Sequence, residues 1–182
     1  MTDSVKKKII LFIKVLIIFN LLIIILDNFV FKKISVDGNS MYPTFENGES
    51  GLSNELALKT NKISRFNVVV AHDKVDNATV IKRVIGLPGE TVVYINDKLY
   101  INGTYVKEDF LDTDHKKEHL KNHDLFTSNC GPFTLSKDEY FLCGDNRPVS
   151  RDSRVIGAFK KDDIISKDII ILSPISRMRI EG

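Results

Sequence analysis

The chain has 182 residues, of which 43% are hydrophobic, and its 26 basic side chains stand against 24 acidic ones. This length allows one modest domain with a real core beyond an N-terminal segment. The near balance of charge gives no basic face for nucleic acid, and two cysteines exclude a dense disulfide framework.

The first element is an almost wholly apolar stretch, residues 9–26, which is interrupted only by Lys14 and Asn20. As a helix it would be roughly 27 Å long, close to the roughly 30 Å hydrocarbon core of a bilayer. Apolar residues on all faces favour a membrane span over a buried helix of a soluble domain. Residues 27–31 offer no small-x-small cleavage site, so we expect an uncleaved anchor rather than a removable signal peptide.

The charges around this stretch predict its orientation. Three lysines at residues 6–8 precede it, and the positive-inside rule then leaves the N-terminus in the cytoplasm. Lys32 and Lys33 follow it and reduce the contrast between the two sides. We predict a cytoplasmic tip with a transmembrane anchor at residues 1–33, an extracytoplasmic domain at residues 34–182, and membrane lipid as a partner.

The rest of the chain carries the signals of antiparallel β-structure. A polar turn at residues 73–77 joins two β-branched runs, and Asn96-Asp97 sits between two more in the manner of a hairpin. Residues 52–59 fit either a short helix or an irregular strand. Strands are predicted at six runs: residues 68–71, 78–85, 91–95, 98–101, 139–143 and 168–172.

The two cysteines, Cys130 and Cys143, leave their pairing open at the level of sequence. Cys143 ends the apolar run 140–143, which is a predicted buried strand. We favour a free thiol in the core at that position.

Residues 107–129 are polar, carry three of the four histidines, and are predicted to form an insertion on the β scaffold. Residues 115–119 match H-x-x-E-H, a zinc-protease signature, and on a helix His115, His119 and His123 would share one face. The stretch lacks an apolar stripe to hold such a helix against a core, and a catalytic zinc needs supporting groups. We therefore favour a solvated helical insertion over adventitious metal binding, and either over a zinc protease. We expect no metal or cofactor, and no part in catalysis for this stretch.

Two residues have the character of a catalytic pair. Ser40 follows the N-terminal segment, and Lys82 lies within an apolar strand. A serine hydroxyl is a weak nucleophile until a base takes its proton, and a lysine is such a base only when burial lowers its pKa. Strand alternation puts Val80 and Val84 on the same face as Lys82, which supplies that apolar setting. The two residues predict a Ser-Lys dyad.

Three blocks of sequence carry a resemblance to a known family. They are Gly38-Asn39-Ser40-Met41-Tyr42-Pro43-Thr44, then Ile81-Lys82-Arg83-Val84-Ile85-Gly86-Leu87-Pro88-Gly89-Glu90, then Gly144-Asp145-Asn146-Arg147 with Ser150, Asp152-Ser153-Arg154 and Gly157. In this order behind an apolar segment, the chain resembles the type I signal peptidases, membrane-bound bacterial Ser-Lys proteases that remove signal peptides. The resemblance covers about residues 35–174.

The resemblance implies that Ser40 is the nucleophile and Lys82 the general base of a mainly β signal-peptidase domain behind a transmembrane helix. It further implies that Ser150 helps to orient the lysine amine, and a hydroxyl can indeed aim the lone pair of a neutral amine. A polar network is implied to support the site, and its members are Asp145, Asp152 and Arg154.

The implied activity is a serine endopeptidase that removes signal peptides from secretory precursor proteins after small-x-small motifs. The enzyme would sit in the cytoplasmic membrane as a single-pass protein with its catalytic domain outside. The extended substrate would add to residues 34–37 and 79–81 as a strand, and the backbone N–H of Ser40 would help to hold the oxyanion. Some relatives instead assist surface-fibre assembly and lack the catalytic pair, but both Ser40 and Lys82 are present here.

Three stretches depart from the family pattern. Residues 65–67 read Arg-Phe-Asn where Arg-Gly-Asp is common, and residues 49–51 read Glu-Ser-Gly, an unusual version of the stretch after the serine block. Gly38 stands where some members carry a Ser or Thr whose hydroxyl donates to the oxyanion. We therefore expect an oxyanion hole with one side-chain donor fewer. Gly38→Ser should raise turnover unless the backbone of Gly38 needs a positive φ.

Overall fold

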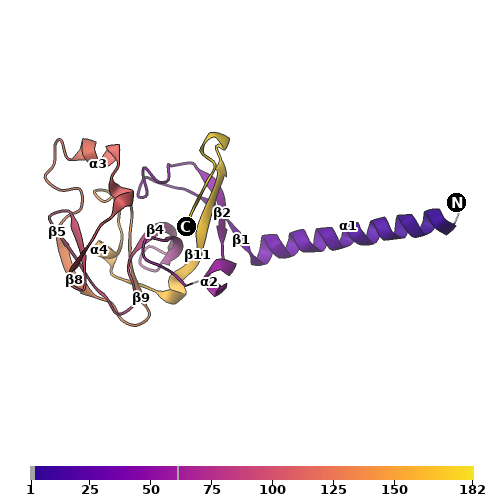
Figure 1. Ribbon diagram of the computed structural model, residues 1–182, viewed down its shortest axis with the longest axis horizontal. Coiled ribbons are helices and arrows are strands. Elements are labelled where there is room, and N and C mark those ends of the chain that lie inside the picture. The colour runs from indigo at the N-terminus through magenta and orange to yellow at the C-terminus, as the bar shows by residue number, and fades with distance from the viewer. Residues whose placement is uncertain (1–2, 61) are drawn as a thin grey trace.

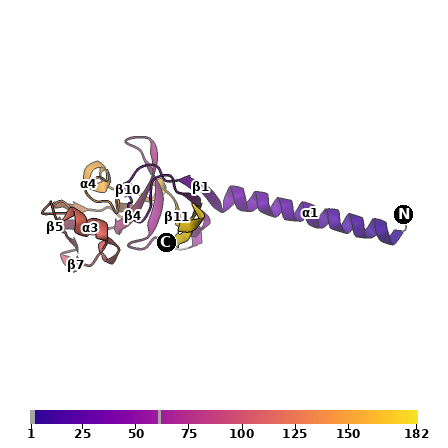
Figure 2. The same cartoon turned by 90° about the horizontal axis from the view of Figure 1, so that it is seen from above.

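The computed structural model describes residues 3–60 and 62–182, apart from the side chains of residues 24–29, 59 and 60. One long helix, α1 (Asp3–Phe29), extends away from a body of β-sheets, and the two views agree on this arrangement (Figures 1 and 2). The mainly β, antiparallel architecture predicted from the sequence is confirmed.

The larger sheet has eight strands in the order β1-β2-β11-β3-β4-β9-β10, with β12 also paired to β11. These strands are β1 (Phe31–Ser35), β2 (Ser50–Asn54), β3 (Val68–Asp73), β4 (Ala78–Gly86), β9 (Glu139–Cys143), β10 (Phe159–Lys160), β11 (Ile164–Ser173) and β12 (Arg179–Glu181). The smaller sheet has the order β7-β6-β5-β8 and lies at the end of the body opposite α1 (Figure 1). Its strands are β5 (Thr91–Ile95), β6 (Lys98–Ile101), β7 (Thr104–Val106) and β8 (Cys130–Thr134).

Short helices lie between these strands. They are α2 (Leu56–Thr60), α3 (Asp114–His119) and α4 (Ser153–Ile156), together with the 3₁₀ turns η1 (Asp109–Leu111), η2 (Lys161–Asp163) and η3 (Ile175–Arg177). Residues 52–59, for which helix and strand were both open, are divided between the end of β2 and the start of α2.

All six predicted strands are present, and the predicted hairpin joins β5 to β6. Asn96 and Asp97 both have positive φ, at 49° and 64°, which is the backbone that a two-residue turn of this kind requires. The strand predicted at residues 168–172 is longer than expected, and its pairing with β2 shifts register between Lys167 and Ile169 and again between Ile171 and Ser173. The prediction of a free thiol at Cys143 is confirmed, and Cys130 is free as well.

One part of the core forms where the loop between β1 and β2 packs on the larger sheet. Met41 and Phe45 of this loop are buried against Val68 of β3 and Ile171 of β11. A second cluster lies around β4 and β9 and contains Val84 and Leu142. Apolar burial therefore fixes both the segment that carries Ser40 and the strand that carries Lys82.

Helix α1 leads directly into β1 and presents exposed apolar side chains from Ile9 to Ile23. Within the described part of the chain, no helix is both long and apolar enough to cross a membrane.

Residues 107–129 form the predicted insertion, between β7 and β8, and the polar helix expected within it is present as α3. Helix α3 has no buried residue, as expected for a polar helix, but the segments on either side of it are packed into the body. Glu108 makes an ion pair of 2.5 Å with the fully buried Arg147, and Phe126 and Thr127 are buried. Hydrogen bonds and a buried ion pair hold this segment where an apolar stripe is missing.

Candidate active site

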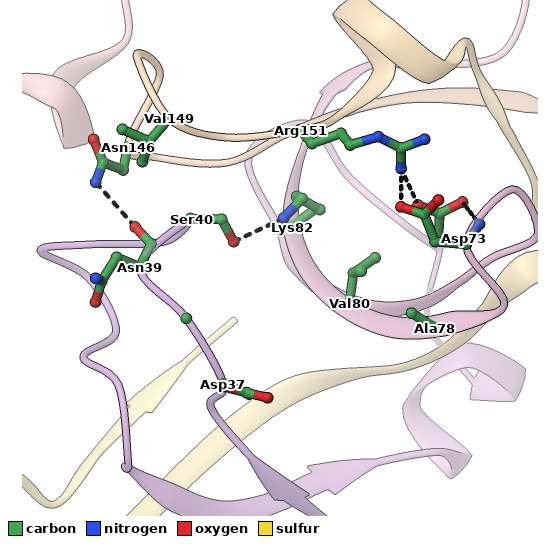
Figure 3. A pocket seen from close by; sticks show the side chains of 12 residues that line it. Asp37, Asn39, Ser40, Asp73, Ala78, Val80, Lys82, Asn146, Val149 and Arg151 are labelled. Atoms are coloured by element: carbon green, nitrogen blue, oxygen red, sulfur yellow. Dashed lines mark hydrogen bonds and ion pairs between the residues drawn. The ribbon is translucent and has the colours of Figure 1, made fainter.

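The structure brings Ser40 and Lys82 together, as the sequence predicts. Ser40 lies on the loop between β1 and β2, and Lys82 lies in the middle of β4. The Lys82 Nζ and Ser40 Oγ atoms are 2.8 Å apart, and the two side chains point toward each other (Figure 3). This distance is short enough for direct proton transfer between them.

Burial sets the protonation of Lys82. The side chain is only 4% exposed, and removal from water lowers the pKa of its ammonium group. The negative charge of Asp152 acts against this shift without cancelling it. A larger share of Lys82 is therefore neutral near pH 7 than for a lysine in water.

Ser150 lies on the segment between β9 and α4, buried at 7% exposure. Its hydroxyl makes no hydrogen bond within the described residues, to Lys82 or to any other group, although it lies near enough to Asp152 to help lower that carboxyl's pKa. Gly144 makes this close packing possible, because a Cβ there would lie 2.2 Å from Ser150 Oγ and 2.3 Å from Ser40 O.

The three charged residues expected to support the site fall into two separate groups. Asp145 makes a two-pronged ion pair with Arg83 at 2.8 and 2.7 Å and accepts a hydrogen bond of 2.5 Å from Thr44 Oγ1. Asp152 instead pairs with Arg154 at 2.8 Å. Arg83 and Thr44 belong to the quoted sequence blocks, but no role was assigned to either.

The Asp152–Arg154 pair fixes the loop that follows β9. Asp152 caps α4 and accepts a 3.0 Å hydrogen bond from Gly144 N, while Arg154 Nη2 donates to Arg147 O at 2.8 Å. Burial raises the pKa of Asp152, but its bonds and charge contact with Arg154 outweigh this effect and leave the pKa below its usual value. The carboxylate therefore stays charged beside Lys82.

Comparison with known proteins assigns the chain to the family that its sequence motifs resemble. The sequence profile described as "Signal peptidase, peptidase S26" matches residues 9–173. The chain belongs to this family. It is 38% identical over 168 residues to signal peptidase I P of Bacillus subtilis subsp. natto, covering 91% of this chain and 89% of that protein. It is 37% identical over 177 residues to signal peptidase I S of Bacillus subtilis, covering 97% and 95%.

A solved structure agrees with these sequence matches. The crystal structure of a signal peptidase I from Enterococcus faecalis V583 is 36% identical and superposes with a TM-score of 0.54. It covers 59% of this chain and 97% of that chain.

In this signal-peptidase fold, Asn146 holds the backbone at Asn39 and Ser40, a contact that sequence reasoning missed. Its backbone N donates to Ser40 O at 3.0 Å. Its side-chain Nδ2 donates to Asn39 O, also at 3.0 Å (Figure 3). Its Oδ1 lies 3.0 Å from His115 Nε2. The position of Asn146 between Asp145 and Arg147 in the third block was the one available signal.

Two connected hollows meet at the dyad. A groove of about 90 Å³ is lined by residues 35–38, 40–41 and 79–82. An open cleft of about 540 Å³ continues past the dyad, where Arg151 faces Asp73 in a 3.0 Å ion pair (Figure 3). The groove borders are the two segments predicted to pair with substrate.

The three histidines His115, His119 and His123 do not converge on one point. His119 and His123 stack their rings at 4.1 Å, whereas His115 turns to Asn146. Among the described residues, no group of three or more His, Cys, Asp or Glu side chains is arranged to hold a metal ion.

Proposed function

We propose that this chain is a membrane-bound serine endopeptidase that removes N-terminal signal peptides from secretory precursors. The single observation that carries the proposal is the 2.8 Å contact between Ser40 Oγ and the buried Lys82 amine, in a chain of the signal peptidase family. No observation favours the alternative role in surface-fibre assembly.

Acylation begins when the neutral Lys82 amine takes the Ser40 proton. Ser40 Oγ then attacks the scissile carbonyl carbon, and the negative charge moves to the carbonyl oxygen. The Ser40 N–H donates to this oxyanion. The Lys82 ammonium returns its proton to the departing amine, which leaves an ester between Ser40 and the signal peptide.

Deacylation reverses the roles of the same groups. Lys82, neutral again, takes a proton from water, and the resulting hydroxide attacks the ester carbon. The second oxyanion collapses, the proton goes from Lys82 to Ser40 Oγ, and the cleaved signal peptide leaves. The Asp145–Arg83 and Asp152–Arg154 pairs act by holding the loops that carry or contact the dyad.

The groove supports the expected substrate preference. An extended peptide added along residues 34–37 and 79–81 would use main-chain hydrogen bonds for affinity. A groove volume of about 90 Å³ suits a small side chain before the cut.

Proteins of this family are membrane-associated, and we propose that residues 1–33 anchor the chain with its N-terminus inside. The apolar stretch at residues 9–26 and the exposed apolar side chains of α1 support this assignment. Protease added outside intact, wall-stripped cells should then digest residues 34–182. Protection of this region in cells, with digestion in inverted vesicles, would reverse the orientation.

The dyad is tested by replacing each member in the full-length protein in detergent. Ser40→Ala and Lys82→Met should each reduce cleavage of a secretory precursor by roughly 10⁴-fold or more, because nucleophile and base act as one unit. Circular dichroism and thermal unfolding check that both variants fold. More than trace turnover by Lys82→Met would contradict the assignment of the base.

The pH profile of the wild type gives a second check. Only the neutral amine acts as base, so kcat/KM should rise with pH and level off above the pKa of Lys82. Since burial lowers this pKa, the plateau should begin below the ordinary lysine value of 10.5. A profile still rising at pH 10.5 would show that Lys82 is not the base.

A further inference from the structure

A chain of three polar groups connects the H-x-x-E-H segment to the backbone of the nucleophile. Asn39 O can only accept a hydrogen bond, so the Asn146 atom that faces it is the Nδ2 donor. Asn146 Oδ1 therefore faces His115, and His115 must donate from Nε2 across the 3.0 Å contact. Asn146 is only 6% exposed, which keeps water from replacing either partner.

The last group in this chain is the peptide between Asn39 and Ser40. Its C=O accepts the hydrogen bond from Asn146, and its N–H is the backbone donor of Ser40. In a trans peptide these two groups point in opposite directions. A hydrogen bond to the C=O therefore fixes the direction of the Ser40 N–H and polarises it toward a stronger donor.

In place of the expectation that this stretch has no part in catalysis, we propose that His115 is a positioning residue for the oxyanion hole and acts through Asn146 on the Ser40 N–H. The inference rests on the proposed function, because it assumes that Ser40 N–H receives the oxyanion. Gly38 supplies no hydroxyl to the oxyanion, so the Ser40 N–H is the donor that remains. In the proposal, His115 and Asn146 orient this N–H through the C=O of the same peptide.

Contacts with two aromatic rings keep the His115 ring in place. The ring meets Tyr42 edge-on at 4.9 Å between centroids and Phe126 at 5.6 Å. Tyr42 lies two residues after Ser40, and Phe126 N donates to Asp97 at 3.1 Å. The aromatic contacts raise the rival explanation that His115 serves only to pack these rings.

Two substitutions separate the donor from the ring. His115→Phe keeps an aromatic ring but removes the donor, and His115→Gln keeps an N–H donor but removes the ring. His119→Phe is the matched control, because His119 also packs on Phe126 but has no bond to Asn146. Each full-length variant is assayed in detergent for kcat and KM on a precursor peptide, with thermal unfolding as the check on folding.

We expect His115→Phe to lower kcat about three- to ten-fold with KM nearly unchanged, a fraction of the 10²–10³-fold effect of losing an oxyanion donor. His115→Gln should stay within about two-fold of wild type, and His119→Phe should match wild type. Full kcat in His115→Phe, or equal losses in the Phe and Gln variants, would overturn the proposal.

The route through Asn146 is tested by a double-mutant cycle. In an Asn146→Ala background, His115→Phe should cause no further loss of kcat, since the connection is already broken. An additive loss would mean that His115 acts by another route. Ser40→Ala is assayed alongside: activity in that variant refutes the proposed function, whereas an inactive Ser40→Ala with a fully active His115→Phe refutes only the role of His115.

Discussion

The backbone of Gly38 has a φ of +90°, in the region that L side chains adopt only with strain. Its N–H donates to Asn47 Oδ1 at 2.9 Å, which closes the turn just before Ser40. A Cβ at this position would meet nothing within 4 Å, so the obstacle to a side chain is conformational rather than steric crowding. Gly38→Ser is expected to raise turnover only if the backbone of Gly38 does not need a positive φ. Its φ is positive, so the expectation does not hold.

We therefore predict that Gly38→Ser and Gly38→Ala both lose activity and about 1 kcal/mol of stability, because each must strain or reshape the turn. Side-by-side kcat values and denaturant unfolding midpoints measure this. If the Ser variant were faster than wild type while the Ala variant was slower, a hydroxyl donor would outweigh the strain.

At the scale of single residues, the sequence predicts the dyad because its chemistry is distinctive and strand alternation fixes the face of Lys82. It does not predict Asn146 as the partner of Asn39, since an asparagine near a turn has many local uses and these residues are 107 positions apart. The backbone conformation of Phe66 is also not predicted from the sequence. It has a φ of 73° where the family commonly has glycine, and its ring packs on Phe110 at 5.1 Å.

At the scale of elements, the β5–β6 turn docks the segment that carries His115. Asp97 accepts hydrogen bonds from Phe126 N at 3.1 Å and Thr127 N at 2.5 Å, while its own φ is positive. The strands and this turn are predictable from β-branched runs and the Asn-Asp pair. The contact between this turn and residues 126–127 is not predictable, because Asp97 binds main-chain amides, which leave no apolar pattern in the sequence.

We predict that Asp97→Gly loosens this segment although glycine suits the turn. Losing two bonds to a carboxylate should outweigh the relaxed φ and cost about 1–2 kcal/mol, with faster amide exchange at Phe126 and Thr127. Because His115 depends on this docking, kcat should fall as well. Asn96→Gly, at the neighbouring exposed position with φ of 49°, is the control and should be neutral. Unchanged exchange in Asp97→Gly would contradict the prediction.

At the scale of the whole molecule, the last strand reaches back to the loop that carries Ser40. Arg179 of β12 pairs with Glu49 at 2.8 Å, donates to Thr44 O, and lies 5.1 Å from the centre of the Phe45 ring. Arg177 adds a contact of 2.7 Å to the same carboxylate. The C-terminal segment thus closes the loop, in a contact across 130 positions of sequence that no local pattern announces.

Glu49 makes this contact sensitive to pH. The side chain is 2% exposed, and burial raises its pKa, but the hydrogen bond from Arg179, that from Glu46 N and the nearby arginine charges bring the pKa below the usual 4.5. A carboxyl whose pKa is lower in the folded state stabilises the fold above its unfolded pKa. That contribution is lost as the pH falls through the folded value.

We predict that Arg179→Met destabilises the protein by about 1–3 kcal/mol at pH 7, because it leaves a buried carboxylate with Arg177 as its remaining arginine. The difference in the free energy of unfolding between variant and wild type should shrink as the pH falls through the folded pKa of Glu49, which lies below 4.5. Denaturant unfolding in detergent at pH 7 and pH 3.5 measures both values. Ile180→Thr, a change at an exposed position of the same strand, is the control and should stay within about 0.5 kcal/mol of wild type. A gap that is equal at both pH values would show that Arg179 stabilises the loop by packing on Phe45 rather than through the charge of Glu49.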